Sequence, residues 1–244
     1  HYASEFRVIA PGAGFAETAR YQKLKPEDYP PWYEQKLWGQ NDTPAYVRNL
    51  FNSEVIAYSG ELDRQIQAAR VMEEAYQAEG RTLTHLIGPM TEHKYEPKTK
   101  QILLEKIDSV LQQAPTVPVP QVTLQTRTLA YKTQHWLSIV RLEEHWRDAR
   151  VDATLAGSEF TLKTKNVSFL NIALPANVHD ANGDVQIIID GQKLTLLTAA
   201  VAVVPLGLNA PLRLQDGGVE LPGGQVIPFD SILAMKDTSR REGR

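Results

Sequence analysis

Two short segments, thirty residues apart, carry side chains that can exchange protons. Asp63 follows the apolar run Val55–Tyr58, and His93 follows the next apolar run, Leu83–Ile87. A carboxylate that accepts the Nδ1–H of a histidine orients the ring, stabilises its protonated form and leaves Nε2 to take a proton from a nucleophile. The sequence therefore predicts Asp63 and His93 as an acid–base pair, if the fold brings the two strand ends together.

A structural interpretation of the same residues is also open. Asp is a favoured N-cap residue, so Asp63 also suits the start of the helix expected from Gln65, and His93 is then a loop residue. Glu61 lies two positions before Asp63 and is an alternative acid. Position in the sequence alone does not decide between these interpretations.

The elements that must position this pair follow an alternating pattern up to about residue 113. Short apolar runs over 6–10, 55–58 and 83–87 predict strands, and apolar residues at spacings of three and four predict helices over 65–79 and 97–113. This alternation is typical of parallel strands covered by helices, and ligands bind at the carboxyl ends of such strands. With only about three strands, the sheet is expected to be incomplete.

The remaining half of the chain has a different pattern. Residues 115–120 read Pro-Thr-Val-Pro-Val-Pro, which predicts a stiff linker between a domain over 1–114 and a second one over 121–238. In the second domain apolar residues alternate with a period of two, and Asp190-Gly191 is a hairpin signal. We expect an all-β, sandwich-like accessory domain there, followed by a frayed tail over 239–244.

Composition narrows the classes of function. The 244 residues include 26 Lys and Arg, 29 Asp and Glu and no Cys, which gives a net charge of −3. A nucleic-acid or anionic-membrane binder usually has a basic excess, so neither partner is expected. The absence of Cys excludes disulfides, thiolate metal sites and a Cys nucleophile. No apolar run is long enough for a membrane span, and no metal or cofactor is expected.

The two segments around the acid and the base carry a family resemblance. The run Ala57–Gln65 (Ala-Tyr-Ser-Gly-Glu-Leu-Asp-Arg-Gln), a helix, a strand and then Gly88–His93 resemble the end of an α/β-hydrolase domain of the prolyl oligopeptidase-like serine peptidases and esterases. The resemblance covers residues 1 to about 113, and the region from Val122 onward resembles the β-rich extension of some bacterial members. It implies an α/β fold with a partial hydrolase sheet, and it implies Asp63 as triad acid and His93 as triad base.

The expected nucleophile is absent from the chain. In this fold the order is Ser, Asp, His, with the serine in a Gly-x-Ser-x-Gly elbow. The serines before Asp63 are Ser4, Ser53 and Ser59, and none has the flanking glycines of an elbow. The chain begins with His1, without a visible signal peptide, and in the family the elbow helix is followed by a strand that resembles 6–10. The resemblance therefore implies a longer parent protein with the elbow shortly before His1, or an elbow on a partner chain.

The predicted function is therefore a part of a serine hydrolase that acts on ester or peptide bonds and is inactive alone. The expected partner is the N-terminal half of the hydrolase domain, or a second copy paired along the exposed sheet edge. The alternative is a non-catalytic binding or scaffold protein, or a degenerate hydrolase. The cellular location stays open, with a secreted or periplasmic parent as one option.

Other candidate sites are weaker. The dipeptides His135-Trp136 and His145-Trp146 fit either a metal pair or tryptophans that anchor a core beside histidines at strand ends. His85 alternates within a strand and is expected to be structural. The aromatic segment 29–38 either lines a substrate pocket or packs over the incomplete sheet.

Overall fold

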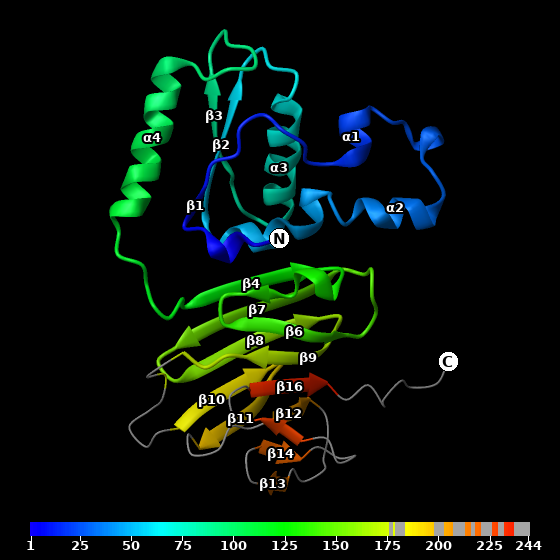
Figure 1. Cartoon of the computed structure of the whole chain (residues 1–244), viewed down its shortest axis with the longest axis vertical. Coiled ribbons are helices and arrows are strands. Elements are labelled where there is room, and N and C mark those ends of the chain that lie inside the picture. Colours follow the sequence, from blue (N-terminus) through cyan, green and yellow to red (C-terminus); the bar gives the residue numbers. More distant parts are fainter. Residues whose placement is uncertain are drawn as a thin grey trace. The chain divides into compact units, whose positions relative to one another are not determined.

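The computed structural model describes residues 1–175, 178 and 184–197, together with the strand residues 203–206, 213–215, 218–220, 226–228 and 232–236 (Figure 1). This part of the chain contains helices, parallel strand pairs and antiparallel strand pairs, so the protein is of mixed α/β class. It divides into two compact units, His1–Pro115 and Thr116–Arg244, which are described one at a time. The tail over 239–244 lies outside the described residues.

The first unit contains a three-stranded parallel sheet. Its strands are β1 (Val8–Ile9), β2 (Glu54–Gly60) and β3 (Thr84–Gly88), in the order β1-β2-β3. The prediction of parallel strands is confirmed. Because β2 and β3 run in the same direction and end in register, the segments that follow them emerge at one edge of the sheet.

Two helices cover opposite faces of this sheet (Figure 1). On one face, Tyr76 of α3 (Ile66–Ala78) packs with the odd-numbered β2 residues. On the other face, Leu103 of α4 (Pro97–Gln112) packs with the even-numbered ones. Strand β2 is therefore buried on both sides, as its continuous apolar run predicts.

Arg7, directly before β1, fastens the end of α4. Its guanidinium donates hydrogen bonds to the carbonyl oxygens of Val110 at 2.6 Å, Leu111 at 3.2 Å and Gln113 at 2.5 Å. The last carbonyls of a helix have no partner within the helix, and a basic side chain satisfies them. The start of the first strand is thus joined to the end of the last helix of the unit.

The long connection between β1 and β2 carries short helical segments on the α3 side of the sheet (Figure 1). They are α1 (Thr18–Gln22), η2 (Pro26–Asp28), α2 (Trp32–Trp38) and η3 (Thr43–Asn52), and a short η1 (Ala3–Glu5) precedes β1. The two ends of the excursion are tied together. Asp42 accepts hydrogen bonds from the backbone and the hydroxyl of Thr18, and the Thr43 N–H donates to the Ala16 carbonyl.

The second unit is built from strands. One five-stranded sheet has the order β11-β10-β8-β7-β4, with bounds Gln192–Leu197, Asp184–Ile189, Glu159–Lys165, Ala149–Ala156 and Gln121–Thr126. The other has the order β12-β16-β9-β6-β5, with bounds Val203–Leu206, Ile232–Lys236, Val167–Ile172, Leu137–Leu142 and Thr133–Gln134. A third sheet joins β13 (Arg213–Gln215), β14 (Gly218–Glu220) and β15 (Val226–Pro228), and a short η4 spans Leu129–Tyr131.

One hydrophobic core serves both five-stranded sheets. Its buried residues alternate along the strands, so that Leu124 and Phe160 come from one sheet and Ile139 and Leu170 from the other. The predicted period of two is confirmed. The predicted hairpin is confirmed as well, because β10 and β11 pair in antiparallel fashion around Asp190–Gly191.

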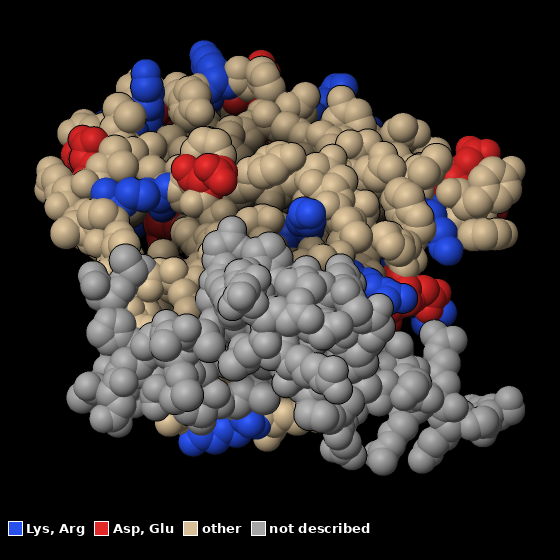
Figure 2. All heavy atoms as spheres, turned by 60° about the horizontal axis from the view of Figure 1, so that its bottom comes forward, with Lys and Arg blue, Asp and Glu red and all other residues tan. Residues whose placement is uncertain are grey.

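Acidic and basic side chains are interspersed over the described surface in Figure 2, with uncharged side chains between them. That face therefore carries no extended field of one sign. Among the described helices, none combines the length and the apolar character that crossing a bilayer requires.

Candidate active site

The carboxyl ends of β2 and β3 are joined by backbone hydrogen bonds. Gly60 and Gly88 are partners in the strand register. Just beyond them, the Glu61 N–H donates to the Gly88 carbonyl at 2.9 Å, and the Leu62 N–H donates to the Thr91 carbonyl at 2.9 Å. The loops that follow the two strands are therefore held side by side, and these loops carry Asp63 and His93.

Asp63 and His93 meet at this edge. The Asp63 Oδ2 atom lies 3.0 Å from His93 Nδ1, within hydrogen-bond distance. The Asp63 side chain is 5% exposed, whereas the His93 side chain is 66% exposed. Nε2 of His93 makes no hydrogen bond to the residues that the structure describes. The arrangement is a buried carboxylate behind an imidazole whose second nitrogen is open to a reactant.

The helix-start interpretation of Asp63 holds at the same time. Its other carboxylate oxygen, Oδ1, accepts a hydrogen bond from the Gln65 N–H at 2.8 Å, and its carbonyl accepts one from Ile66. One oxygen therefore fixes the turn into α3 while the other faces His93. Because the hydrogen bond from Gln65 orients the carboxylate, it also directs Oδ2 toward Nδ1 of His93.

Glu61, the alternative acid, has a different partner. Its Oε2 atom accepts a hydrogen bond from the Met90 N–H at 2.7 Å. Of the two carboxylates in this turn, Asp63 is the one in contact with His93. Glu61 instead braces the loop between β3 and His93.

Tyr58, on β2, holds the His93 loop in place through hydrogen bonds of its hydroxyl group. Its side chain is buried, and its hydroxyl donates to the Lys94 carbonyl at 3.0 Å and accepts from the Glu96 N–H at 2.7 Å. Its ring also packs against Tyr95, with 4.5 Å between ring centroids. The loop is thereby anchored on the residue directly after His93. This role was not predictable from the sequence, because a tyrosine in an apolar run is equally suited to fill a core.

Glu96 then starts α4. Its carboxylate accepts hydrogen bonds from the N–H groups of Lys98 and Thr99. These backbone donors lower the pKa of Glu96. The His93 loop therefore ends in a fixed helix start.

Gly60 permits the close contact of the two loops, and Gly88 leaves room for the Tyr58 side chain. A Cβ atom at Gly60 would overlap the carbonyls of Thr91 and Glu92, and one at Gly88 would overlap the Tyr58 hydroxyl. Only glycine allows this approach. A glycine at each of two adjacent strand ends is the signal from which the close approach could have been predicted.

A second histidine cluster lies within the first unit, under α3. His85 on β3 places Nε2 3.0 Å from the Ser59 hydroxyl and Nδ1 3.0 Å from a Glu73 carboxylate oxygen. The His85 side chain is 2% exposed and Ser59 is 1% exposed. The order of groups is that of a serine triad, but its serine is buried below the helix, which agrees with a structural role for His85.

Glu73 gains two hydrogen-bond donors in this cluster. Burial acts to raise its pKa, but the hydrogen bonds from Arg70 and His85 outweigh burial, so the pKa of Glu73 is lowered. The cluster links α3, β3 and β2 next to Gly60. It therefore stiffens the strand end from which the Asp63 turn begins.

Ser53, another serine before Asp63, lies at the opposite end of β2 from the acid–base pair. Its hydroxyl donates to the carbonyls of Ala3 and Phe6. The fold therefore does not bring Ser53 or Ser59 to His93. That the nucleophile lies before His1 or on a partner chain stays a prediction.

The tryptophan–histidine dipeptides are in the second unit. Trp136 is part of the core, and its ring centroid lies 5.1 Å from that of Phe160. Its indole N–H donates a hydrogen bond to the Val119 carbonyl. His145 is exposed. Within the residues that the structure describes, no group of three His, Cys, Asp or Glu side chains is placed to hold a metal ion.

The aromatic segment 29–38 packs mainly on itself. The rings of Tyr29 and Trp38 meet edge-on with 5.4 Å between their centroids, and those of Trp32 and Tyr33 do so with 5.9 Å. The Lys36 ammonium lies 4.8 Å from the Trp32 ring. Trp32 is 67% exposed, so the segment presents aromatic surface.

In comparisons with known proteins, neither a family model, nor a curated protein, nor a solved structure matches this chain.

Proposed function

We propose that the first unit supplies the acid and the base of a serine hydrolase of the α/β-hydrolase type, acting on ester or peptide bonds. The contact between Asp63 and His93 carries this proposal. Their order along the chain, their position after neighbouring parallel strands and the open Nε2 are what such an enzyme requires. The family resemblance of the same segments adds to it.

In the proposed reaction, Asp63 keeps the proton of His93 on Nδ1. Nε2 then removes the proton of a serine hydroxyl as its oxygen attacks the carbonyl carbon of the substrate. The protonated ring, stabilised by Asp63, returns that proton to the leaving alcohol or amine as the bond breaks. Water then attacks the acyl-enzyme as Nε2 takes one of its protons, and the imidazolium gives that proton to the serine oxygen as the acid product leaves with the other.

The serine and the oxyanion donors come, in this proposal, from an N-terminal half of the domain that pairs with β1. An open groove of about 520 Å³ runs beside this strand and includes Val8, Ile9 and Leu50. Tyr2 and Phe6, which also line it, are each 58% exposed. An outer strand flanked by exposed rings suits the addition of a further strand.

The second unit would be a sandwich-like accessory domain of this hydrolase. Support comes from the single core shared by its two five-stranded sheets. The buried apolar residues of its described strands face that core, as in a domain that folds around its own interior.

The test has two parts, a mass measurement and a variant series. Intact mass of the protein from its natural source, with any chain that co-purifies, should reveal a longer polypeptide or a partner with a serine elbow. A lone species of 27.3 kDa would contradict the proposal and favour the binding or scaffold alternative.

For the assembled protein, His93→Ala should lower kcat for an activated ester by about 10³-fold or more. His145→Ala, a change at an exposed histidine of the second unit, serves as the matched control and should leave kcat unchanged. Full activity of the His93 variant would reject the assignment.

A further inference from the structure

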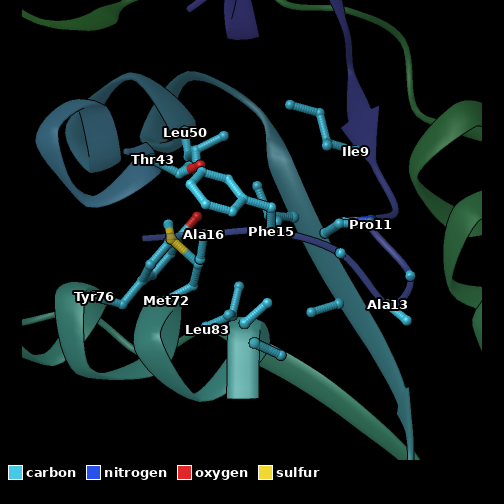
Figure 3. A pocket seen from close by; sticks show the side chains of 16 residues that line it. Ile9, Pro11, Ala13, Phe15, Ala16, Thr43, Leu50, Met72, Tyr76 and Leu83 are labelled. Atoms are coloured by element: carbon cyan, nitrogen blue, oxygen red, sulfur yellow. The ribbon is translucent and has the colours of Figure 1, made fainter. Parts of the chain in front are cut away.

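The first unit contains an apolar cavity that is separate from the acid–base pair. It has a volume of about 380 Å³ and lies between the sheet, α3 and the segment after β1 (Figure 3). None of the side chains that line it belongs to the loops carrying Asp63 and His93. Its volume is within the range of about 300–1,000 Å³ found for small-molecule sites.

Small residues on three elements create this space. Ala57 comes from β2, Ala68 and Ala69 come from α3, and the segment 12–16 reads Gly-Ala-Gly-Phe-Ala. Larger side chains of Ile9, Val55 and Leu83 complete an aliphatic wall. Phe15, which also lines the cavity, is 42% exposed, so the cavity reaches the surface beside it.

One polar group lies in this apolar environment without a partner. Tyr76 is 6% exposed, and its buried hydroxyl makes no hydrogen bond to the residues that the structure describes. In Figure 3 its side chain extends from α3 into the cavity, next to Met72. Burial raises the pKa of Tyr76, so the group stays a neutral donor. A buried hydroxyl without a partner is unfavourable, and a bound molecule that pairs with it removes the deficit.

We propose that this cavity binds a neutral, mainly aliphatic small molecule with one carbonyl or hydroxyl oxygen, which pairs with the Tyr76 hydroxyl. The aliphatic wall selects the apolar body, and Tyr76 selects the oxygen. No charged side chain lines the cavity, and the two charges that act on the Tyr76 hydroxyl, Glu54 and Arg81, oppose each other, so a carboxylate there would have no counter-ion among the lining residues. This favours a ketone, an ester or an alcohol over a fatty-acid anion.

Two methionines make the proposal measurable in the full chain. Met72 lines the cavity, whereas Met90 is 78% exposed and serves as an internal control. With ¹³C-methyl methionine, titration of methyl hexyl ketone should shift the Met72 signal in a saturable way and leave the Met90 signal in place. The Met72 signal is assigned with Met72→Leu.

Two ligand controls and one variant identify the role of the hydroxyl. Octane should bind more weakly than the ketone, and octanoate should not shift the Met72 signal. Tyr76→Phe should weaken ketone binding by about three- to tenfold, the effect of one hydrogen bond, without changing octane binding. Equal binding of ketone and octane in the unchanged protein would overturn the proposal, because the cavity would then be an unselective apolar void.

A filled cavity provides the final check. Ala68→Leu places a larger side chain in the space and should abolish the Met72 response. If that variant fails to fold, Tyr76→Phe, which changes no wall volume, still decides the outcome. A Met72 signal that does not respond to the ketone rejects the site. None of these measurements depends on hydrolase activity, so their failure is distinguishable from failure of the proposed function.

Discussion

Asp63 Oδ2 lies 3.0 Å from His93 Nδ1, although thirty residues separate them. The contact follows from the parallel register of β2 and β3, which ends with Gly60 opposite Gly88. The acid is buried and the base is exposed, so the carboxylate is fixed while the ring faces reactants. The first prediction separates the two functions of this carboxylate.

Asp63→Asn should preserve the helix start and remove the charge. Asn caps a helix about as well as Asp, so we expect a free energy of unfolding within about 0.5 kcal/mol of the unchanged protein. Hydrolytic activity of the assembled protein should fall by about 10³- to 10⁴-fold, because the ring loses its charged partner. Asp63→Ala should lose the cap as well, at about 1 kcal/mol. Urea unfolding and ester hydrolysis measure the two effects. Normal activity of the Asn variant would reject the role of the charge.

Gly60→Ala should destabilise the first unit by about 1–3 kcal/mol, the usual cost of forcing atoms into a packed region. The added methyl group would overlap the carbonyls of Thr91 and Glu92 and push the His93 loop away from Asp63. Gly14→Ala is the matched control, since its Cβ atom would come no closer than 3.9 Å to a neighbour. Urea unfolding should show a loss for Gly60→Ala only. Equal stability of both variants would contradict the close contact between Gly60 and the carbonyls of Thr91 and Glu92.

Tyr58→Phe should cost about 1–3 kcal/mol, since it removes two part-buried hydrogen bonds that hold the His93 loop, each worth about 0.5–1.5 kcal/mol. The hydroxyl lost is the one bound to Lys94 and Glu96. Amide hydrogen exchange should become faster at Glu96 in this variant. Tyr95→Phe removes a hydroxyl from a ring that is 45% exposed and serves as the control. Unchanged exchange at Glu96 would contradict the anchoring role of Tyr58.

The lowered pKa of Glu73 predicts a loss of stability in acid. The folded-state pKa of Glu73 is below the ordinary value of 4.5. Its contribution to the free energy of unfolding is therefore complete at a pH above 4.5. The contribution is lost as the pH falls through the lowered pKa, because the protonated carboxyl no longer pairs with Arg70 and His85. Glu73→Gln should flatten the stability curve in this acid range, and the control Glu105→Gln at an exposed helix position should not. A curve that keeps its acid slope in Glu73→Gln would refute the assignment.

The regular elements of the first unit were predictable because their signals are local. Continuous burial of β2 followed from the apolar run at 55–58, and the start of α4 followed from Pro97. The meeting of Asp63 and His93 was also predictable, because carboxyl ends of adjacent parallel strands share an edge. Local pattern and topology together were sufficient for these features.

The supporting contacts were not predictable in the same way. The partnership of His85 with Glu73 depends on the strand register and on the face that α3 turns to the sheet, which one sequence does not specify. The double hydrogen bond of Tyr58 depends on where the following loop returns. The cavity beside Tyr76 results from small residues on three separate elements. They come together only when these elements pack, so the local sequence pattern does not predict the cavity.

The anchoring of α4 by Arg7 has a mechanical consequence. The chain leaves the first unit immediately after the carbonyls that Arg7 holds, at the beginning of the proline-rich segment 115–120. Tension along that segment would act on these hydrogen bonds and, through Arg7, on the outer strand β1. The outer strand β1 and the exit of the chain at residue 115 thus share one point of attachment at Arg7, so strain at either would be felt at the other.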